Sequence, residues 1–346
     1  MSKTRIEGIR IAGISTCVPP RVLDNLELGK AFGDDEVRKV VSMAGIQYRP
    51  VVDVGVTATD LCFEAAVPLL DRIGWARESI TGLILVTQSP DYVLPSSSCV
   101  AHKWLGLSTD CATFDMGMGC SSYPYGLYIA GSMLRAGGQQ RVLLLNGDTP
   151  SLFTSPGDHA TSLLFADAGS ATAIEIDATA GSSFFNLHTD GSGYDGLIIR
   201  GGAFRDRFPA NPRDNFLTMD GAGVFNFTIK RVPPLIRDAL EFAGLTVADV
   251  DQYLFHQSNQ FMMKHLIKKC GLPLERVPFV LNRFGNCGGP SVPVALTNGR
   301  KPGDAVPGRV MFLGYGVGLS WGAATLQLRP DTPLLHSVYA GSMARA

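Results

Sequence analysis

The stretch FDMGMGCSSYPYGL, residues 114–127, decides the fold class of this chain. The apolar run ATFDM, which begins at residue 112, predicts a β-strand, and the Gly-x-Gly sequence after it predicts a turn. A periodic apolar run follows and predicts a helix: Tyr125, Leu127, Tyr128, Ile129, Met133 and Leu134. Cys120 is therefore expected at or near the helix N-terminus. Exposed amide N–H groups and the positive end of the helix dipole favour a thiolate there.

Two polar residues far away along the chain complete a candidate catalytic set. His256 lies in FHQSNQ, and Asn286 lies in FGNCGGPSVPVAL. A neutral histidine and an Asn amide can both donate hydrogen bonds, and two donors that converge on one oxygen stabilise an enolate without a metal. Gly117 and Gly119 are expected to leave room for a substrate beside the thiol. The ordinary alternatives are a buried inert thiol, a core histidine and a turn asparagine, and Cys287 is the competing nucleophile.

Short β-rich runs alternate with longer helical patterns along the chain, which predicts an α/β fold. The first series includes GLILVTQ, RVLLLNGD and ATAIEID, and a second series begins near SSFFNLH and ends with RVMFLGYG and WGAATLQL. Two such series predict a duplicated architecture with a boundary near residue 176. The Gly- and Pro-rich stretch 190–215 is expected to be a loop, and the tail after Pro330 is expected to be weakly ordered.

Composition argues against several functional classes. With 346 residues, 45% of them apolar, the chain is long enough for a large core in one domain or two fused domains. A net charge of −1 without a basic stripe argues against nucleic-acid binding. The N-terminus lacks a signal-like apolar segment and no apolar run is long enough to span a bilayer, so we expect a cytoplasmic protein without a membrane partner. Seven cysteines and six histidines without metal-ligand spacing predict neither disulfides nor a zinc site. Motifs of nucleotide-binding proteins, serine hydrolases and zinc proteases do not occur.

These residues, together with LGYGVGLSWGAA at 313–324, resemble the β-ketoacyl-acyl-carrier-protein synthases of the type III group, within the thiolase superfamily. The resemblance extends over nearly the whole chain, and the combination of HQSN, GN and SVPVAL carries it. It implies a thiolase-like duplicated fold of five αβαβα layers. It also implies an N-terminal half, residues 1–175, with the nucleophile, and a C-terminal half, residues 176–346, with the His and the Asn.

The resemblance further implies a mechanism. Cys120 takes an acyl group from a thioester while the backbone N–H groups of Cys120 and Val317 hold the oxyanion. His256 and Asn286 stabilise the enolate formed as a malonyl-type thioester loses carbon dioxide, and the carbanion attacks the acyl group to give a β-ketoacyl thioester. We expect a specialised fatty-acid or polyketide-type pathway. The alternatives are an acyltransferase with an oxygen, nitrogen or sulfur acceptor, and a non-catalytic scaffold subunit.

The substrates implied are thioesters of coenzyme A or of an acyl carrier protein, with no cofactor or metal held by the chain. Family members that use acetyl-CoA have Trp and Arg side chains at the tunnel entrance, at positions occupied here by Lys39, Met43, His159 and Phe261. We therefore expect weak CoA binding.

Other positions imply contacts with the carrier and with a second subunit. Asn259 matches the family and is expected to orient the pantetheine arm. Lys268 and Lys269, with Lys264 nearby, form a basic patch for an acidic carrier protein, and the alternative is an ordinary solvated face. Leu94 matches a position often occupied by a Phe that the partner subunit inserts at the end of the acyl pocket. The resemblance thus implies a homodimer, and the Leu predicts acyl chains longer than acetyl.

Overall fold

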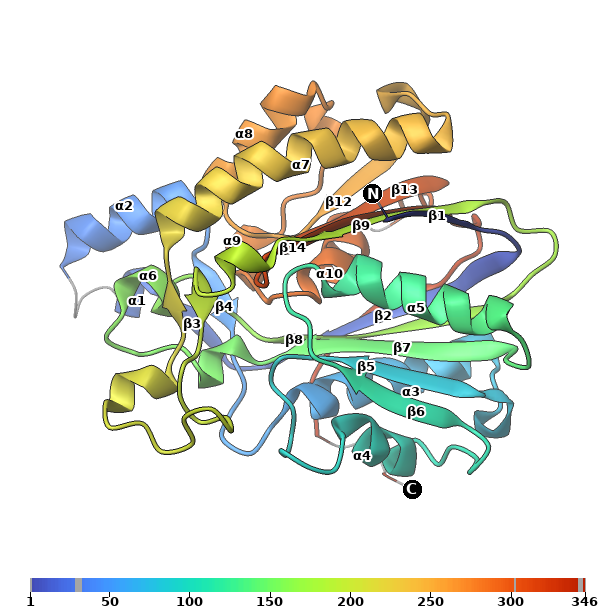
Figure 1. The fold of residues 1–346 in the computed structure, drawn as a ribbon, viewed down its shortest axis with the longest axis horizontal. Helices are drawn as coiled ribbons and strands as arrows, with labels where there is room; N and C mark the ends of the chain where they lie inside the picture. The colour runs from blue at the N-terminus through green and yellow to red at the C-terminus, as the bar shows by residue number, and fades with distance from the viewer. Residues whose placement is uncertain (1, 29–32, 302, 342–344, 346) are drawn as a thin grey trace.

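Five layers of alternating helices and sheets make up the chain in a computed structural model that describes residues 2–28, 33–301, 303–341 and 345 (Figure 1). Two mixed sheets lie one above the other, with helices between them and on both outer faces. This order confirms the five-layer α/β fold that the sequence predicts. No helix in the described ranges is both long and apolar enough to cross a bilayer.

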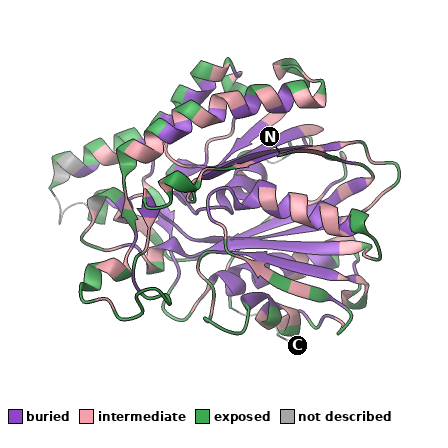
Figure 2. Cartoon of the chain, viewed as in Figure 1, coloured by how far each residue is buried: buried purple, intermediate pink, exposed green. Residues whose placement is uncertain are grey.

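The larger sheet has six strands in the order β15-β2-β8-β7-β5-β6. Its strands are β2 (Ile9–Val18), β5 (Gly82–Val86), β6 (Ala112–Met116), β7 (Arg141–Asp148), β8 (Ala168–Ile176) and β15 (Leu334–Val338). β5 is parallel to both β6 and β7, whereas β8 is antiparallel to β7 and β2. The central strands β5 and β7 are almost wholly buried, as expected for a sheet that is covered on both faces (Figure 2).

The smaller sheet has five strands in the order β1-β9-β14-β13-β12. Its strands are β1 (Ser2–Ile6), β9 (Ser183–Thr189), β12 (Gln252–Phe255), β13 (Arg309–Gly316) and β14 (Ser320–Gln327). β12 and β13 are parallel, and the other pairs are antiparallel. The parallel pair brings the carboxyl ends of β12 and β13 together, and this edge carries part of the site described below.

The long helices form three layers around these sheets. α5 (Ser122–Ala136) and α10 (Ser291–Asn298) lie between the sheets, α3 (Ala58–Ile73) and α4 (Ser97–Trp104) cover the larger sheet, and α7 (Gly221–Ala243) and α8 (Gln260–Cys270) cover the smaller one. α5 packs closely because its glycines have no side chain. A Cβ at Gly126 would lie 2.8 Å from Leu144, and a Cβ at Gly131 would lie 2.7 Å from Ile9.

Shorter elements cover the end of the molecule at which the sheets meet. The hairpin of β3 (Val22–Asp24) and β4 (Tyr48–Pro50) lies beside α1 (Asn25–Leu28), α2 (Asp34–Ala44), α6 (His159–Ser162) and α9 (Leu281–Phe284). The stretch 190–215 is irregular, as expected, apart from short 3₁₀ turns and β10 (Leu197–Ile198), which pairs with β11 (Thr218–Met219).

Both chain ends cross to the opposite sheet. β1 pairs with β9 in the smaller sheet, and β15 pairs in parallel with β2 in the larger sheet. The expectation of a weakly ordered tail after Pro330 is therefore wrong, because residues 334–338 find hydrogen-bond partners at the edge of the larger sheet. The division into halves at 1–175 and 176–346 stays a prediction.

Candidate active site

Segments from both sheets meet at one cavity. Cys120 lies between β6 and α5, and His256 follows β12. Val317 follows β13, and Asn286 follows α9. The His256 N–H donates to the Leu313 carbonyl of β13 at 2.7 Å, which fixes the two strand ends side by side. The structure thus brings the three predicted catalytic side chains to the wall of one cavity of about 100 Å³.

The rest of the cavity wall is mainly apolar. It is formed by residues from α7, α8, β10, β11, β13 and the segment before β8, among them Leu164, Phe165, Leu197, Met219, Val224, Met262 and Tyr315. An apolar wall with a few polar groups at one end suits an uncharged chain whose reactive end meets the polar groups.

Burial dominates the electrostatics of Cys120. The residue is 8% exposed, and desolvation raises the pKa of its thiol to about 11. The backbone N–H groups of Val317 and of Cys120 itself act in the opposite direction, because they favour the thiolate. Burial thus opposes the thiolate that the helix N-terminus favours, and the loss of water has the larger effect on the pKa. The two N–H groups at the sulfur are the pair predicted for the oxyanion site.

Two glycines of LGYGVG let the end of β13 pass over the nucleophile. A Cβ at Gly316 would lie 2.8 Å from Cys120 Sγ, and a Cβ at Gly314 would lie 2.7 Å from Ser121 Cα. The expectation for Gly119 is wrong. A Cβ there would lie 2.1 Å from the Gln88 side chain, so this position accommodates protein packing and not a substrate. Gly117 has open space, as expected.

His256 is neutral and held by its Nδ1 side. The residue is 2% exposed, and burial lowers its pKa to about 4. Nδ1 lies 2.9 Å from Ser291 Oγ and 3.1 Å from the Gly288 carbonyl oxygen. The Ser291 hydroxyl accepts the Gln257 N–H at 3.1 Å, so its own proton can be donated to Nδ1, and the ring proton is then on Nε2. A ring proton on Nδ1 is donated to Gly288 instead.

The Asn286 amide is oriented by its oxygen. Oδ1 accepts the Gly288 N–H at 3.1 Å, while Nδ2 makes only a long 3.4 Å contact with the Ser258 carbonyl. The amide nitrogen therefore remains available as a donor toward the cavity. Cys287, the alternative nucleophile, is fully buried, and burial raises its pKa further than that of Cys120.

Two residues that the sequence analysis did not single out lie next to the site, Ser291 beside His256 and Asp148 beside Gly288. Ser291 opens α10 and contacts His256 directly. Asp148 ends β7, is buried, and accepts the Gln88 N–H at 2.7 Å and the Thr87 hydroxyl at 3.2 Å. Burial raises the Asp148 pKa to about 7. The sequence signals were the serine that opens SVPVAL and the aspartate that ends RVLLLNGD.

The predicted substrate-binding residues are not all at the cavity. Asn259 lines it, and its Oδ1 caps α8 by accepting the Met262 N–H at 2.7 Å. Lys268 and Lys269 lie in the last turn of α8, about 13 Å further along the helix axis. Lys269 Nζ donates to the Ile229 carbonyl at 3.0 Å, which ties α8 to α7.

Leu94 does not line the Cys120 cavity of its own chain. It is 78% exposed, next to the exposed Tyr92 and Val93. Its peptide bond to Pro95 is cis.

The predicted entrance combines two exposed apolar side chains with one exposed cation. Met43 in α2 and Phe261 in α8 are both exposed, and Phe261 stacks on Phe225 with ring centroids 5.8 Å apart. Phe261 and Phe225 directly adjoin Met262 and Val224 of the cavity wall. Lys39 is exposed on α2, and the His159 side chain lies outside the described part of the chain.

Comparison with known proteins identifies the family. The family model of 3-oxoacyl-(acyl-carrier-protein) synthase III matches residues 114–193. The model of the C-terminal part of the same synthase matches residues 240–328. A Campylobacter jejuni protein assigned as a 3-oxoacyl-(acyl-carrier-protein) synthase 3 is 33% identical over 94% of this chain and 96% of its own length. This chain belongs to the 3-oxoacyl-(acyl-carrier-protein) synthase III family.

Solved structures agree with this family assignment. A 3-oxoacyl-(acyl-carrier-protein) synthase of Burkholderia xenovorans is 38% identical with a TM-score of 0.92, covering 97% of this chain and 98% of the other. The priming β-ketosynthase of the R1128 polyketide pathway is 25% identical with a TM-score of 0.85, and the match covers 94% of this chain and 97% of the other. The predicted thiolase-like fold and the predicted class, a condensing acyltransferase, are therefore confirmed.

Proposed function

We propose that this synthase holds an acyl group on Cys120 and condenses it with a malonyl-type thioester, releasing carbon dioxide. The observation that supports this most strongly is the convergence on one cavity. The side chains of Cys120, His256 and Asn286 line the same cavity, and the backbone N–H of Val317 favours the Cys120 thiolate.

Acylation begins with a proton transfer from the Cys120 thiol to His256 Nε2. This step uses the ring form with its proton on Nδ1, which Gly288 accepts, because Nε2 then has a lone pair. The thiolate attacks the thioester carbonyl, and the N–H groups of Cys120 and Val317 hold the oxyanion. The carrier thiolate leaves and takes the proton from Nε2, so His256 is neutral again.

Condensation uses the other ring form. With the Ser291 hydroxyl donating to Nδ1, His256 Nε2–H and Asn286 Nδ2–H both donate to the thioester oxygen of the malonyl group. The bond to the carboxylate breaks, carbon dioxide leaves, and the electron pair is held as an enolate. The carbanion attacks the acyl carbon, and the Cys120 thiolate leaves and is protonated by solvent. Ser291 is thus a positioning residue that selects the ring form.

Carrier-bound thioesters are the proposed substrates, and the entrance supports an acyl carrier protein over free CoA. Met43 and Phe261 offer no positive charge to the phosphates of CoA, whereas Lys264 and Lys268 are exposed on α8. The pathway, fatty-acid or polyketide-type, and the cytoplasmic location stay predictions.

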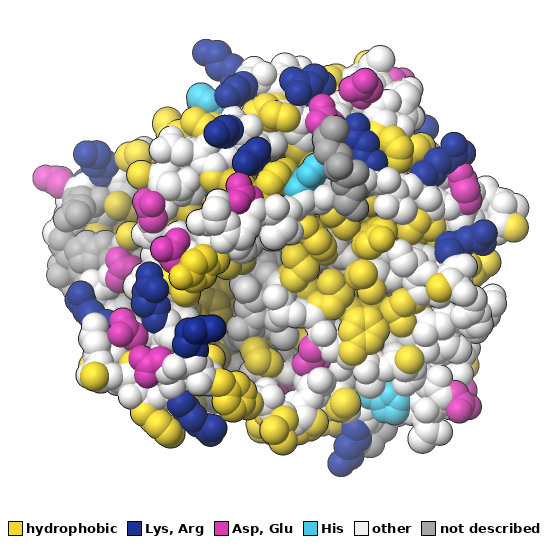
Figure 3. Space-filling view, viewed as in Figure 1, with side chains coloured by type: hydrophobic (Ala, Val, Ile, Leu, Met, Phe, Trp, Pro, Cys, Tyr) yellow, Lys and Arg dark blue, Asp and Glu magenta, His cyan; other side chains and the backbone are white. Residues whose placement is uncertain are grey.

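We also propose a homodimer in which Leu94 reaches the partner subunit's acyl pocket. β6 is an edge strand with an exposed Phe114, and Tyr92, Val93 and Leu94 are exposed in a row. Hydrophobic side chains gather around the position of α5 on the same face (Figure 3). An edge strand beside an apolar surface supports pairing with a second copy. Sedimentation should give twice the mass of 37.0 kDa, and Leu94→Asp should shift it toward the monomer.

The test of function is intact-protein mass spectrometry after incubation with acyl-CoA and acyl-carrier-protein donors of graded chain length. We expect an adduct on the wild type, more from carrier-protein donors and longer chains than from acetyl-CoA, and none on Cys120→Ala. Addition of a malonyl-carrier protein should then remove the adduct and release carbon dioxide. Asn286→Ala should still acylate but release much less carbon dioxide.

The same assay discriminates the two alternatives. An adduct that is passed to an alcohol, amine or thiol acceptor without carbon dioxide release would favour plain acyl transfer. A wild type that no donor acylates would favour the scaffold subunit. A pair of donors at an enolate oxygen stabilises the condensation step and is not needed for plain acyl transfer, which favours condensation.

A further inference from the structure

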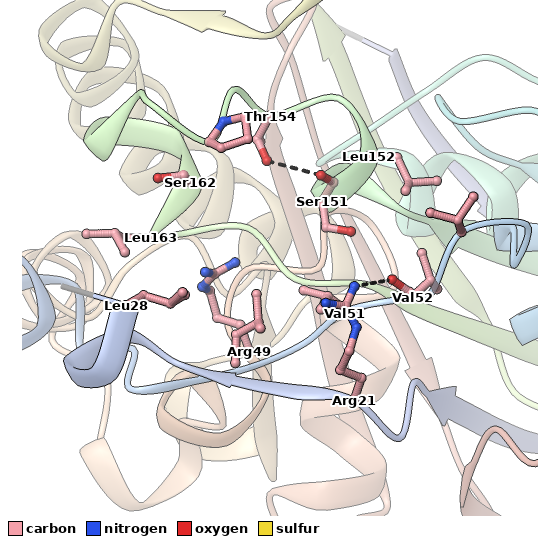
Figure 4. A pocket seen from close by; sticks show the side chains of 13 residues that line it. Arg21, Leu28, Arg49, Val51, Val52, Ser151, Leu152, Thr154, Ser162 and Leu163 are labelled. Carbon is pink, nitrogen blue, oxygen red and sulfur yellow. Dashed lines mark hydrogen bonds between the residues drawn. The ribbon is translucent and has the colours of Figure 1, made fainter. Parts of the chain in front are cut away.

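A second pocket lies away from Cys120, between the β3–β4 hairpin and the segment 151–163 (Figure 4). Its volume is about 330 Å³, and it shares no lining residue with the Cys120 cavity. Buried apolar side chains form its floor, namely Val51, Val52 and Leu163, and exposed ones form its rim, among them Leu28, Val54 and Leu152. An apolar pocket of this size accommodates a small molecule.

Arg49 brings a buried positive charge to this pocket. The residue is 4% exposed, its Nε donates to Asn25 Oδ1 at 2.7 Å, and its Nη1 donates to the Phe165 carbonyl at 2.8 Å. Both acceptors are neutral, and within the described ranges no carboxylate lies within 4.0 Å of the guanidinium. Burial lowers the Arg49 pKa to about 10, and the charge of the buried Asp167 acts in the opposite direction. A buried cation that no carboxylate contacts directly is only partly compensated, so the pocket favours an anionic ligand.

The guanidinium also has unused donors near an unused hydroxyl. Two of its five N–H groups are accounted for, and Nη2 has no hydrogen-bond partner in the described part of the chain. Ser162 Oγ, on the wall opposite β4, is buried without a partner among the described residues. Figure 4 shows Arg49 pointing from β4 toward the segment that carries Ser162.

We propose that this pocket binds a free carboxylic acid with a short apolar chain. The carboxylate accepts hydrogen bonds from Arg49 and Ser162, and the chain lies against Leu152 and the other apolar rim residues. Arg21, at the outer side, is already paired with Asp53 at 2.8 Å and contributes less charge. This site goes beyond the proposed condensation and does not depend on it.

Arg49 itself is unsuitable for a test substitution, because it also supports the catalytic site. Arg49 holds the Phe165 carbonyl, and the two residues beside Phe165 bond the backbone of Asn286. The Leu164 carbonyl accepts the Asn286 N–H at 3.0 Å, and the Ala166 N–H donates to the Asn286 carbonyl at 2.9 Å. Leu152 is a better position. It is 51% exposed, lines the pocket, and has no role in the catalytic cavity.

The experiment is calorimetric titration of the full-length protein with octanoate at pH 7.5, with octanol and acetate as matched ligands. We expect octanoate to bind about tenfold tighter than either, because it alone combines charge and chain. Leu152→Glu, which puts a negative charge at the rim, should weaken octanoate at least about tenfold, while the uncharged control Leu152→Gln should change it by less than about threefold. Cys120 acylation should be unchanged in both variants.

Three results would overturn the proposal. One is no heat of binding for octanoate, and another is equal binding of octanol, which would mean an apolar groove without an anion site. The third is unchanged octanoate affinity in Leu152→Glu, which would place the ligand in the Cys120 cavity. Since Cys120 acylation is measured on the same samples, a failure of the condensation proposal is recognised separately.

Discussion

Gly316→Ala is the substitution whose effect follows most directly from the geometry. Gly316 has φ +152°, a region that residues with a side chain rarely adopt. The added Cβ would lie 2.7 Å from Cys120 Cβ and 2.8 Å from its Sγ, where ordinary contacts begin at 3.4 Å. Either the thiol or the backbone that bears the Val317 N–H must therefore move.

The size of the effect can be worked from these distances. Moving Sγ from 2.8 Å to 3.4 Å is a displacement of about 0.6 Å, which we expect to slow Cys120 acylation by about tenfold to hundredfold, since a misplacement of about 1 Å costs about hundredfold. The strained φ and the clash together should lower the free energy of unfolding by about 1–3 kcal/mol. The protein should therefore still fold.

The assay is the time course of the acyl adduct by intact mass, with thermal unfolding on the same samples. Gly117→Ala is the matched control, because it adds the same methyl group to the turn before Cys120, and its Cβ would meet nothing within 4 Å. It should acylate at the wild-type rate and change stability by less than about 0.5 kcal/mol. The reasoning fails if Gly316→Ala acylates within twofold of the wild type, or if both alanine variants are slowed equally.

Three further predictions concern protons. Alkylation of Cys120 by iodoacetamide in the free protein should become about tenfold faster per pH unit between pH 7 and 10, since the thiol pKa is about 11, and a plateau below pH 8 in the mass-spectrometric rate would contradict this. Ser291→Ala should move the His256 ring proton from Nε2 to Nδ1, as seen in ¹⁵N NMR spectra, and should slow carbon dioxide release more than acylation. The control Ser291→Thr keeps the hydroxyl and should keep the wild-type ring form and the wild-type rates. Unchanged ¹⁵N shifts in the alanine variant would refute the role of the hydroxyl. Between pH 6.5 and 4 the unfolded state binds a proton at His256 that the folded state does not. The free energy of unfolding therefore decreases as the pH is lowered through this range. Over this window the wild type should lose up to about 3 kcal/mol more than His256→Gln in urea unfolding, and parallel losses would show that His256 is not the group concerned.

The strand, turn and helix around Cys120 could be predicted because each is encoded locally. Apolar periodicity, a Gly-x-Gly turn and a second periodic run lie within one short stretch, and β6 and α5 form where they indicate. The tail after Pro330 could not be predicted in this way. Leu334–Val338 is ordered by pairing with β2, whose residues lie at the other end of the chain.

The same contrast holds at the site. The order of Cys120, His256 and Asn286 and their neighbouring motifs indicated the catalytic set and the family. The protonation states of these side chains could not be predicted from the sequence, because they depend on how many atoms from distant segments exclude water from each side chain. The local argument favoured a thiolate, whereas the assembled protein favours a thiol. Likewise, the sequence predicted space for a substrate at Gly119, whereas in the folded protein the Gln88 side chain occupies that space.

The sequence by itself thus determined the fold class, the reaction family and the three candidate residues that line one cavity, because periodicity and motif chemistry are properties of short segments. Only the tertiary structure decided which hydrogen bonds orient the His256 ring and the Asn286 amide, that Ser291 contacts His256, and that the buried Arg49 lines a second pocket. These are properties of packing, in which segments far apart in the chain set one another's solvation and partners.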